Sequence, residues 1–373
     1  MAGIYVHIPF CRSKCAYCNF FSVPDMTKKE SFLCALEREI EQRKDYLLEP
    51  INTIYFGGGT PSLLAVEDIG RIIAMIARHF TLNDDMEITI ECNPDTLSLE
   101  YLRGIYDVGV NRLSIGIQSF FDDDLEYLNR RHDSYRALQC LDWIVDAGFS
   151  NYTIDLIYGI PTLTDEKWMR NLDIFMQYHI PHLSAYALTV EPKTILDVMI
   201  AKGKKNPVDE EQCARQFMML MHRMKDNGYE HYEISNFAKP GCYSRHNTSY
   251  WCDVTYLGLG PSAHSFDGVS RQWNVSSLAS YLNGMKEGLT VFEREHLRTD
   301  DRYNEYVMTS LRTMWGCDLN YVRSRFGDTY YSYSLHTAEK LIKRGLMKID
   351  AEHLILTDDG KLLADGVAVE FFI

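Results

Sequence analysis

Residues 7–20 read HIPFCRSKCAYCNF and directly follow the short apolar run Gly-Ile-Tyr-Val at residues 3–6. They place three thiols, Cys11, Cys15 and Cys18, at the spacing C-x3-C-x2-C. If the segment coils at about 3.6 residues per turn, the three sulfurs lie within an arc of about 60° and can converge on one small object. A four-iron cluster normally takes four thiolates. Three would leave one iron open to another molecule, much as a catalytic zinc keeps one position free.

Three other interpretations of these cysteines compete with the iron–sulfur cluster. A zinc site could combine the three thiolates with His7. A disulfide could leave one spare thiol, or the three cysteines could be unrelated to each other. The spacing favours the cluster over all three alternatives.

The spacing, with an aromatic residue directly before the third cysteine, resembles the signature of the radical S-adenosylmethionine (SAM) family. In that family the open iron chelates the amino and carboxylate groups of SAM, and an electron from the cluster can cleave the sulfonium. The resemblance therefore implies a [4Fe–4S] cluster on Cys11, Cys15 and Cys18 and SAM as a second cofactor. It also implies an electron donor if SAM is cleaved.

Composition and charge narrow the classes of protein that the chain can represent. Its 373 residues suffice for one large domain and a smaller one. No uncharged run of about 18 residues is present to span a bilayer. Ten cysteines and no basic-then-apolar leader indicate a reducing compartment, so we expect a cytoplasmic protein. The net charge of −14 disfavours a nucleic-acid partner.

Buried strands alternate with amphipathic helices from residue 3 to residue 192. The predicted strands are 3–6, 51–56, 86–92, 112–117, 152–158 and 182–190, and the predicted helices are 28–47, 66–80, 98–108, 125–130, 135–147 and 164–178. Units of roughly 30 residues imply a parallel sheet with right-handed crossovers. Glycine, proline and polar residues recur at the carboxyl ends of the strands, where barrel active sites lie. We therefore predict an α/β fold with a partial (β/α)6 TIM-like barrel over residues 1–195.

The regular alternation ends near Asp197. Residues 196–292 read as an extension that completes the barrel, with a helix at 210–227 whose methionine stripe we interpret as core, and a strand at 229–236. The remaining residues, 293–373, predict three helices and a β hairpin. These helices are 303–314, 321–326 and 334–344, followed by β segments at 347–349 and 353–357 and a last helix. Such a winged-helix-like α+β domain does not by itself imply DNA binding.

Several strand ends carry residues that suit a SAM site beside a cluster. The glycines of Gly57–Pro61 would let the backbone approach a ligand. Glu91 and Asp155 can accept hydrogen bonds from ribose hydroxyls or an amino group, and Arg130 can pair with a carboxylate in a forked geometry. Each residue alone would more often be an ordinary packing or surface residue. Their recurrence on one rim is what favours a site.

Nearly the whole chain resembles the branch of the radical SAM family related to oxygen-independent coproporphyrinogen dehydrogenase. The motifs are YVHIPFC at 5–11, GGGTP at 57–61, IECNP at 90–94, RLSIGIQSF at 112–120, NRRH at 129–132 and IDLIYGIP at 154–161. The resemblance implies which residues line the SAM pocket. They are Tyr5, Tyr17, Gly58, Gly59, Thr60, Glu91, Gln118, Arg130 and Asp155.

Two departures separate the chain from the oxidase of that branch. The oxidase motif continues to a fourth cysteine two residues after the third, where this chain has Phe20. The oxidase also has a sizeable segment before its first strand, whereas this sequence begins at the strand.

A second motif, HNTSYW at residues 246–251, matches the H-N-x-x-Y-W motif of the HemW-type haem chaperones. The resemblance implies haem-binding candidates at His246, Asn247, Tyr250 and Trp251. Histidine is a common axial ligand of haem iron, and the two aromatic rings offer flat apolar surface. A buried, hydrogen-bonded His–Asn corner beneath the barrel is the alternative interpretation.

The leading hypothesis is a haem chaperone that binds haem as cargo and delivers it to recipient haemoproteins. The alternative is the oxidase, which decarboxylates coproporphyrinogen III in porphyrin biosynthesis through a 5′-deoxyadenosyl radical. A radical SAM reaction on another substrate and a structural zinc module also stay open. Whether the protein is an enzyme is left undecided, because the cluster and SAM motifs are intact while the fourth oxidase cysteine is Phe20.

Overall fold

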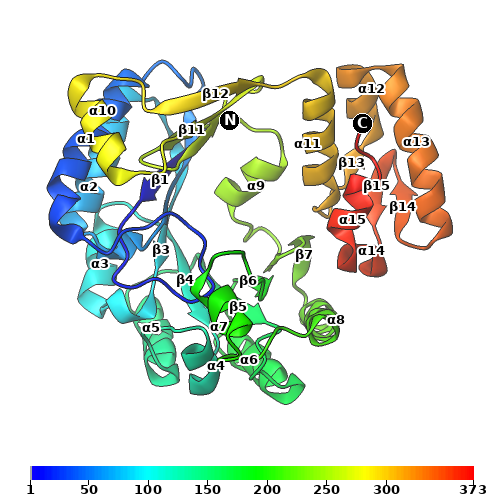
Figure 1. Cartoon of the computed structure of the whole chain (residues 1–373), viewed down its shortest axis with the longest axis horizontal. Helices are drawn as coiled ribbons and strands as arrows, with labels where there is room; N and C mark the ends of the chain where they lie inside the picture. Colours follow the sequence, from blue (N-terminus) through cyan, green and yellow to red (C-terminus); the bar gives the residue numbers. More distant parts are fainter. Residues whose placement is uncertain (1) are drawn as a thin grey trace.

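The computed structural model describes residues 2–373, and Figure 1 shows a curved sheet wrapped by helices beside a smaller C-terminal domain. Six parallel strands form the centre of the sheet in the order of the sequence. They are β1 (Ala2–Ile8), β2 (Ile51–Gly58), β3 (Leu82–Cys92), β4 (Arg112–Gln118), β5 (Tyr152–Tyr158) and β6 (His182–Ala187). Their apolar residues are buried over most of each strand, as expected for parallel strands covered on both faces.

Amphipathic helices connect these strands and cover the outer face of the sheet (Figure 1). They are α1 (Lys29–Gln42), α2 (Val66–His79), α3 (Leu99–Asp107), α4 (Asp122–Tyr127), α5 (Ser134–Asp146) and α6 (Asp165–Gln177). The side chains of Ser98, Asp133 and Thr164 accept backbone N–H groups at the starts of α3, α5 and α6. This alternation confirms the predicted α/β fold with a partial (β/α)6 barrel.

Additional strands extend both sides of the parallel core without closing the barrel. Beyond β1 lie β9 (Tyr256–Leu259), β10 (His264–Phe266), β11 (Ser270–Asn274) and β12 (Phe292–His296), and beyond β6 lie β8 (Asn236–Ala238) and β7 (Glu230–Glu233). The 12-stranded sheet therefore ends at β12 on one side and β7 on the other. The prediction of a single strand at 229–236 is wrong, because residues 234–235 form a turn and the two halves pair antiparallel.

Four further helices belong to this part of the chain. They are α7 (Ile195–Ala201), α8 (Glu210–Asp226), α9 (Arg245–Trp251) and α10 (Leu278–Glu287). The apolar stripe of α8, including Met221 and Met224, is buried in the barrel core, which confirms its interpretation as packing. Figure 1 draws α9 between the two ends of the sheet.

The C-terminal domain has a core of its own, distinct from that of the barrel. Its elements are α11 (Thr299–Leu311), β13 (Cys317–Asp318), α12 (Leu319–Phe326), α13 (Asp328–Lys343), β14 (Met347–Asp350), β15 (His353–Leu356), α14 (Asp358–Leu362) and α15 (Ala364–Val369). Three helices and a small sheet are present, as predicted. However, α13 begins at Asp328 rather than Ser334, directly after Gly327 with its φ of 101°.

Across residues 2–373, no helix combines the length and the apolar character that crossing a bilayer requires.

Candidate functional site

The cysteine loop leaves the end of β1 and is held by backbone hydrogen bonds rather than by helical coiling. Val23 N–H donates to Pro9 O at 2.7 Å, and Cys11 N–H donates to Val23 O at 3.0 Å. Ala16 N–H donates to Leu128 O at 3.1 Å, which ties the loop to the chain after α4. Residues 11–20 contain no helix, so the helical geometry assumed from the spacing is wrong. These backbone anchors, rather than helical turns, fix the course of the loop that carries the thiols.

Polar groups from the turn after β2 and from the segment after α4 contact the cysteine sulfurs. Thr60 Oγ1 donates to Cys11 Sγ at 3.3 Å, and Arg130 Nη1 donates to Cys15 Sγ at 3.3 Å. Burial raises the pKa of the Cys18 thiol, and the nearby sulfurs of Cys15 and Cys11 add to this rise. Hydrogen bonds to sulfur are a normal feature of protein-bound iron–sulfur clusters. Three soft thiols on one loop, two of them receiving hydrogen bonds, therefore fit a cluster.

Within residues 2–373, no three His, Cys, Asp or Glu side chains lie close enough together to hold a metal ion. All three cysteines are free and partly exposed, so the thiols are available for ligation.

The turn after β2 requires glycine because it packs directly against the cysteine loop. Gly59 N–H donates to Ile8 O at 2.8 Å, and a Cβ on Gly59 would lie 2.5 Å from Phe10 O. Gly58 has a φ of 106°, and a Cβ there would lie 2.7 Å from the His7 imidazole. Both contacts are closer than a Cβ can approach, so the predicted role of these glycines in close backbone approach has a geometric basis.

Two carboxyl groups, Glu91 on β3 and Asp155 on β5, lie near each other in the barrel. Glu91 accepts hydrogen bonds from Tyr55 Oη at 2.9 Å and from Gly58 N–H at 3.1 Å. Burial raises the pKa of Glu91 to about 7, and the neighbouring Asp155 contributes to this rise. Burial likewise raises the pKa of Asp155 to about 7. This part of the barrel can thus exchange protons near neutral pH or accept hydrogen bonds from a ligand.

Arg130 connects the cysteine loop to the ends of β3 and β4. Its guanidinium donates to Gly116 O at 2.7 Å, to Asn93 Oδ1 at 2.8 Å and to the Tyr17 hydroxyl at 3.5 Å. Asn93 in turn donates to Thr60 Oγ1 at 3.0 Å. The sequence motif contained Asn93 without assigning it a role, although its position directly after a strand was the available signal.

His7 does not offer a free nitrogen for a zinc ion. Its Nδ1 pairs with the Tyr5 hydroxyl at 3.2 Å, and its Nε2 donates to Phe21 O at 2.9 Å. This arrangement weakens the interpretation of the site as zinc bound by His7 and three cysteines.

Gln118 at the end of β4 adopts a φ of 70°, a left-handed backbone conformation that non-glycine residues seldom occupy.

His246 lies at the opposite end of the barrel from the cysteine loop. Its Nδ1 pairs with Thr53 Oγ1 at 2.8 Å, near the amino end of β2, and its Nε2 pairs with the Tyr250 hydroxyl at 2.9 Å. Its ring stacks on Tyr55 with centroids 5.0 Å apart, and Glu87 accepts its backbone N–H at 3.0 Å. Burial lowers the pKa of His246 to about 3, so the ring is neutral.

The other two residues of the H-N-x-x-Y-W motif point to different surroundings. The Arg312 guanidinium lies 5.4 Å from the centre of the Trp251 ring. Asn247 donates its backbone N–H to Ser244 Oγ at 3.3 Å. It is not the partner of the His246 ring, because both ring nitrogens pair with Thr53 and Tyr250. The alternative interpretation therefore had the right environment for the histidine and the wrong partner. Haem binding by these four residues stays a prediction.

We expect His246→Ala to lower the free energy of unfolding by about 3–5 kcal/mol, because it leaves a cavity and two buried hydroxyls without a partner. Urea unfolding of both proteins measures this difference. His222→Ala is the control, because His222 is exposed on α8. A loss below about 1 kcal/mol would show that the hydrogen-bonded corner contributes little to the fold.

Family models match both parts of the chain: the radical SAM superfamily over residues 5–174 and the HemN C-terminal domain over residues 287–363. The heme chaperone HemW of Mycobacterium tuberculosis (strain H37Rv) is 34% identical over 371 residues, which cover 98% of this chain and 93% of that protein. HemW of Bacillus subtilis (strain 168) is 33% identical over 371 residues, and the match covers 98% of this chain and 98% of that protein.

A solved structure of coproporphyrinogen III oxidase (HemN) from Escherichia coli superposes with a TM-score of 0.85. It is 25% identical, and the match covers 99% of this chain and 89% of that one. The fold is thus shared with the oxidase, whereas the sequence is closer to the two chaperones. The chain belongs to the HemW heme chaperone family within the radical SAM superfamily.

Proposed function

We propose that this protein is a haem chaperone that binds haem and delivers it to recipient haemoproteins. The observation that carries the proposal is the 34% identity, over nearly its full length, to a relative named as a heme chaperone. Phe20 supports it further, because this residue is 68% exposed at the position of the oxidase's fourth cysteine. An exposed phenyl ring cannot replace a thiol in chemistry at that position.

We propose Cys11, Cys15 and Cys18 as ligands of a [4Fe–4S] cluster. When bound, the cluster supplies an open iron for SAM and an electron that can cleave its sulfonium. Arg130 is well placed to orient this site, because it already contacts Cys15 and the ends of two strands. Glu91 can accept hydrogen bonds from SAM hydroxyl or amino groups.

The remaining residues that we propose for SAM are Tyr5, Tyr17, Gly58, Gly59, Thr60, Gln118 and Asp155. We also propose a cytoplasmic location, which the ten free thiols support. An electron donor is a further partner if SAM is cleaved.

The second candidate function is the oxygen-independent oxidation of coproporphyrinogen III, a step of porphyrin biosynthesis. The structural match to HemN, with a TM-score of 0.85, favours this candidate. Phe20 argues against it for the reason given above.

One pair of experiments on the anaerobically reconstituted protein separates the two functions. Ferric haem is titrated and followed by its Soret absorption, and apomyoglobin is then added as a general acceptor. In parallel, the protein is incubated with SAM, dithionite and coproporphyrinogen III. We expect saturable haem uptake, transfer to apomyoglobin and no decarboxylated product. Product formation would overturn the chaperone-only proposal, and so would a failure to take up haem.

A further inference from the structure

A large apolar cavity lies between the barrel and the C-terminal domain. It has a volume of about 820 Å³ and is bounded by α8 and the end of β6 on one side and by α14 and α15 on the other. Leu188, Val190 and Phe217 line the barrel side, and Leu362 and Leu363 line the domain side. Leu363 is 53% exposed, so the domain side of the cavity presents apolar surface to solvent. Cavities of this size hold cofactor-sized ligands.

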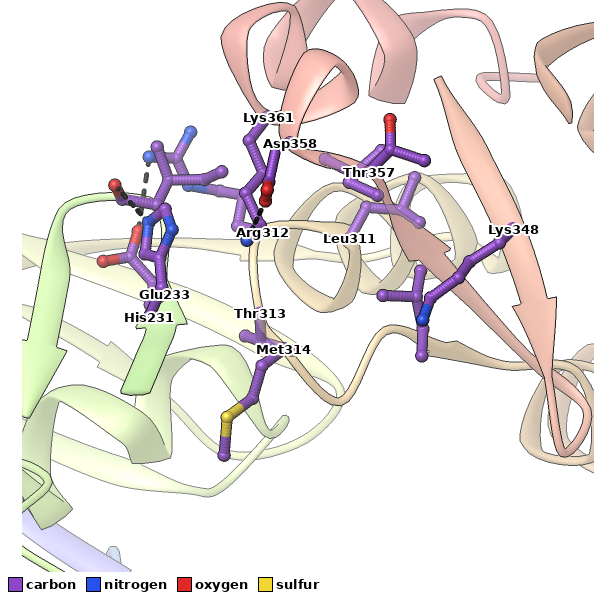
Figure 2. Close-up of a pocket in the computed structure, with 13 residues that line it drawn as sticks. His231, Glu233, Leu311, Arg312, Thr313, Met314, Lys348, Thr357, Asp358 and Lys361 are labelled. Atoms are coloured by element: carbon purple, nitrogen blue, oxygen red, sulfur yellow. Dashed lines mark hydrogen bonds and ion pairs between the residues drawn. The ribbon is translucent and has the colours of Figure 1, made fainter. Parts of the chain in front are cut away.

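A second cavity of about 330 Å³ adjoins the first and is more polar. The two cavities share Ile234, Arg312 and Lys361 in their walls. Figure 2 shows this second cavity with His231 of β7, Met314, Lys348 of β14 and Lys361 of α14 around it. Two lysines, a histidine and a thioether therefore lie next to a large apolar space.

The His231 ring is held in the manner of a metal-binding histidine. Its Nε2 lies 3.0 Å from Ile234 O, and because a carbonyl only accepts, Nε2 carries the proton. Nδ1 is then the unprotonated nitrogen, and it is buried without a hydrogen-bond partner in the described chain. Phe237 stacks on the ring with centroids 4.1 Å apart and fixes its orientation. Metal-bound histidines commonly donate their other N–H to a backbone carbonyl in this way.

The contacts that close the interface over His231 are partly solvent-exposed. Arg312 pairs with Glu233 at 3.4 Å and with Asp365 at 2.6 Å, and Lys361 pairs with Asp358 at 3.2 Å. The Asp365 side chain is 83% exposed, so its ion pair contributes little stability. A ligand carboxylate can therefore replace Asp365 as the partner of Arg312, or Asp358 as the partner of Lys361, at a small cost. The structure shows no hydrogen bond or ion pair of Lys348 among residues 2–373.

We propose that haem binds in this interdomain cleft, with its ring across the two adjoining cavities, its two carboxylates on Lys361 and Lys348, and its iron on Nδ1 of His231. The inference rests on the proposed chaperone function and adds the site. Iron binding at either ring nitrogen of His246 would break one buried hydrogen bond, at a cost of about 1–3 kcal/mol for leaving its partner unsatisfied. Nδ1 of His231 has none to break. Side chains of α14 must move aside, since they cover this nitrogen.

Ferric haem titration of the full-length protein tests the ligand. We expect His231→Ala to weaken haem binding at least about tenfold and to change the Soret spectrum. His336→Ala is the control, because His336 is exposed on α13 of the C-terminal domain. Thermal unfolding of each variant establishes that it is folded. Unchanged affinity in folded His231→Ala, or a loss confined to His246→Ala, overturns the site and leaves the proposed function intact. If wild type takes up no haem, the proposed function fails first.

A measurement on the wild-type protein tests the cleft without any substitution. Cys213 lines the large cavity, whereas Cys34 is exposed on α1. Each is alkylated with iodoacetamide, with and without ferric haem, and quantified by peptide mass spectrometry. We expect haem to slow modification of Cys213 at least about threefold while Cys34 reacts at an unchanged rate. Equal rates at Cys213 with and without bound haem overturn the cleft as the site.

Discussion

We expect the replacement of Cys15 with serine to remove the cluster. After anaerobic reconstitution with iron and sulfide, the wild-type protein holds about four irons per chain, and Cys15→Ser holds less than about one. Serine supplies a hard, protonated oxygen in place of a soft thiolate, and the loop then offers two ligands to a cluster that already lacks a fourth. Arg130 Nη1 also loses the sulfur to which it donates at 3.3 Å. Iron and acid-labile sulfide analysis measures the change.

The matched control for this prediction is Cys34→Ser, which alters an exposed thiol on α1 and not in the loop. It keeps the full iron content if Cys11, Cys15 and Cys18 are the ligands. A Cys15→Ser protein that retains the cluster would show that another residue completes the ligand set. A wild-type protein that binds one zinc and no iron would contradict the cluster altogether.

The order of strands and helices follows from the sequence because a parallel sheet imposes a simple pattern. Long apolar runs are buried on both faces, and each helix between them has one apolar stripe. The close approach at Gly58 and Gly59 could be anticipated for the same kind of reason, since only glycine lacks the Cβ that would meet His7 or Phe10. These features depend on residues near each other in sequence or on regular periodicity.

Contacts between distant segments were harder to predict. The cysteine loop is shaped by backbone hydrogen bonds to Val23 and Leu128, which no local spacing encodes, so the assumption of helical coiling failed. The turn at residues 234–235 carries no glycine or proline, and the hairpin of β7 and β8 was read as one strand. The role of His246 depends on Thr53, almost two hundred residues away, and on a helix lying inside the curve of the sheet.

The pH dependence of stability follows from the two enclosed carboxyl groups. The pKa values of Glu91 and Asp155 rise from 4.5 and 3.8 to about 7 on folding. Between about pH 4 and pH 7 the folded state therefore binds more protons than the unfolded state, and the contribution of this pair to stability falls as pH rises. Above about pH 8 both groups are ionised in both states, and the contribution stays constant at its lowest value.

We expect the double variant Glu91→Gln/Asp155→Asn, compared with wild type, to gain stability on the order of 5 kcal/mol more at pH 8 than at pH 5, or about 2.5 kcal/mol for each carboxyl group. The amides keep the shape and remove the enclosed charges. Buried neutral histidines such as His246 favour folding as pH rises, so the difference between the two proteins is the relevant quantity rather than either curve alone. Urea unfolding at both pH values, without SAM or iron, measures it. The control is Glu67→Gln on the exposed face of α2, for which the difference should not change with pH. If the stability difference between the double variant and wild type were the same at pH 5 and pH 8, these carboxyl groups would ionise inside the barrel as readily as in water. The interior would then have to be far wetter than their enclosure by Tyr55 and the strand ends suggests.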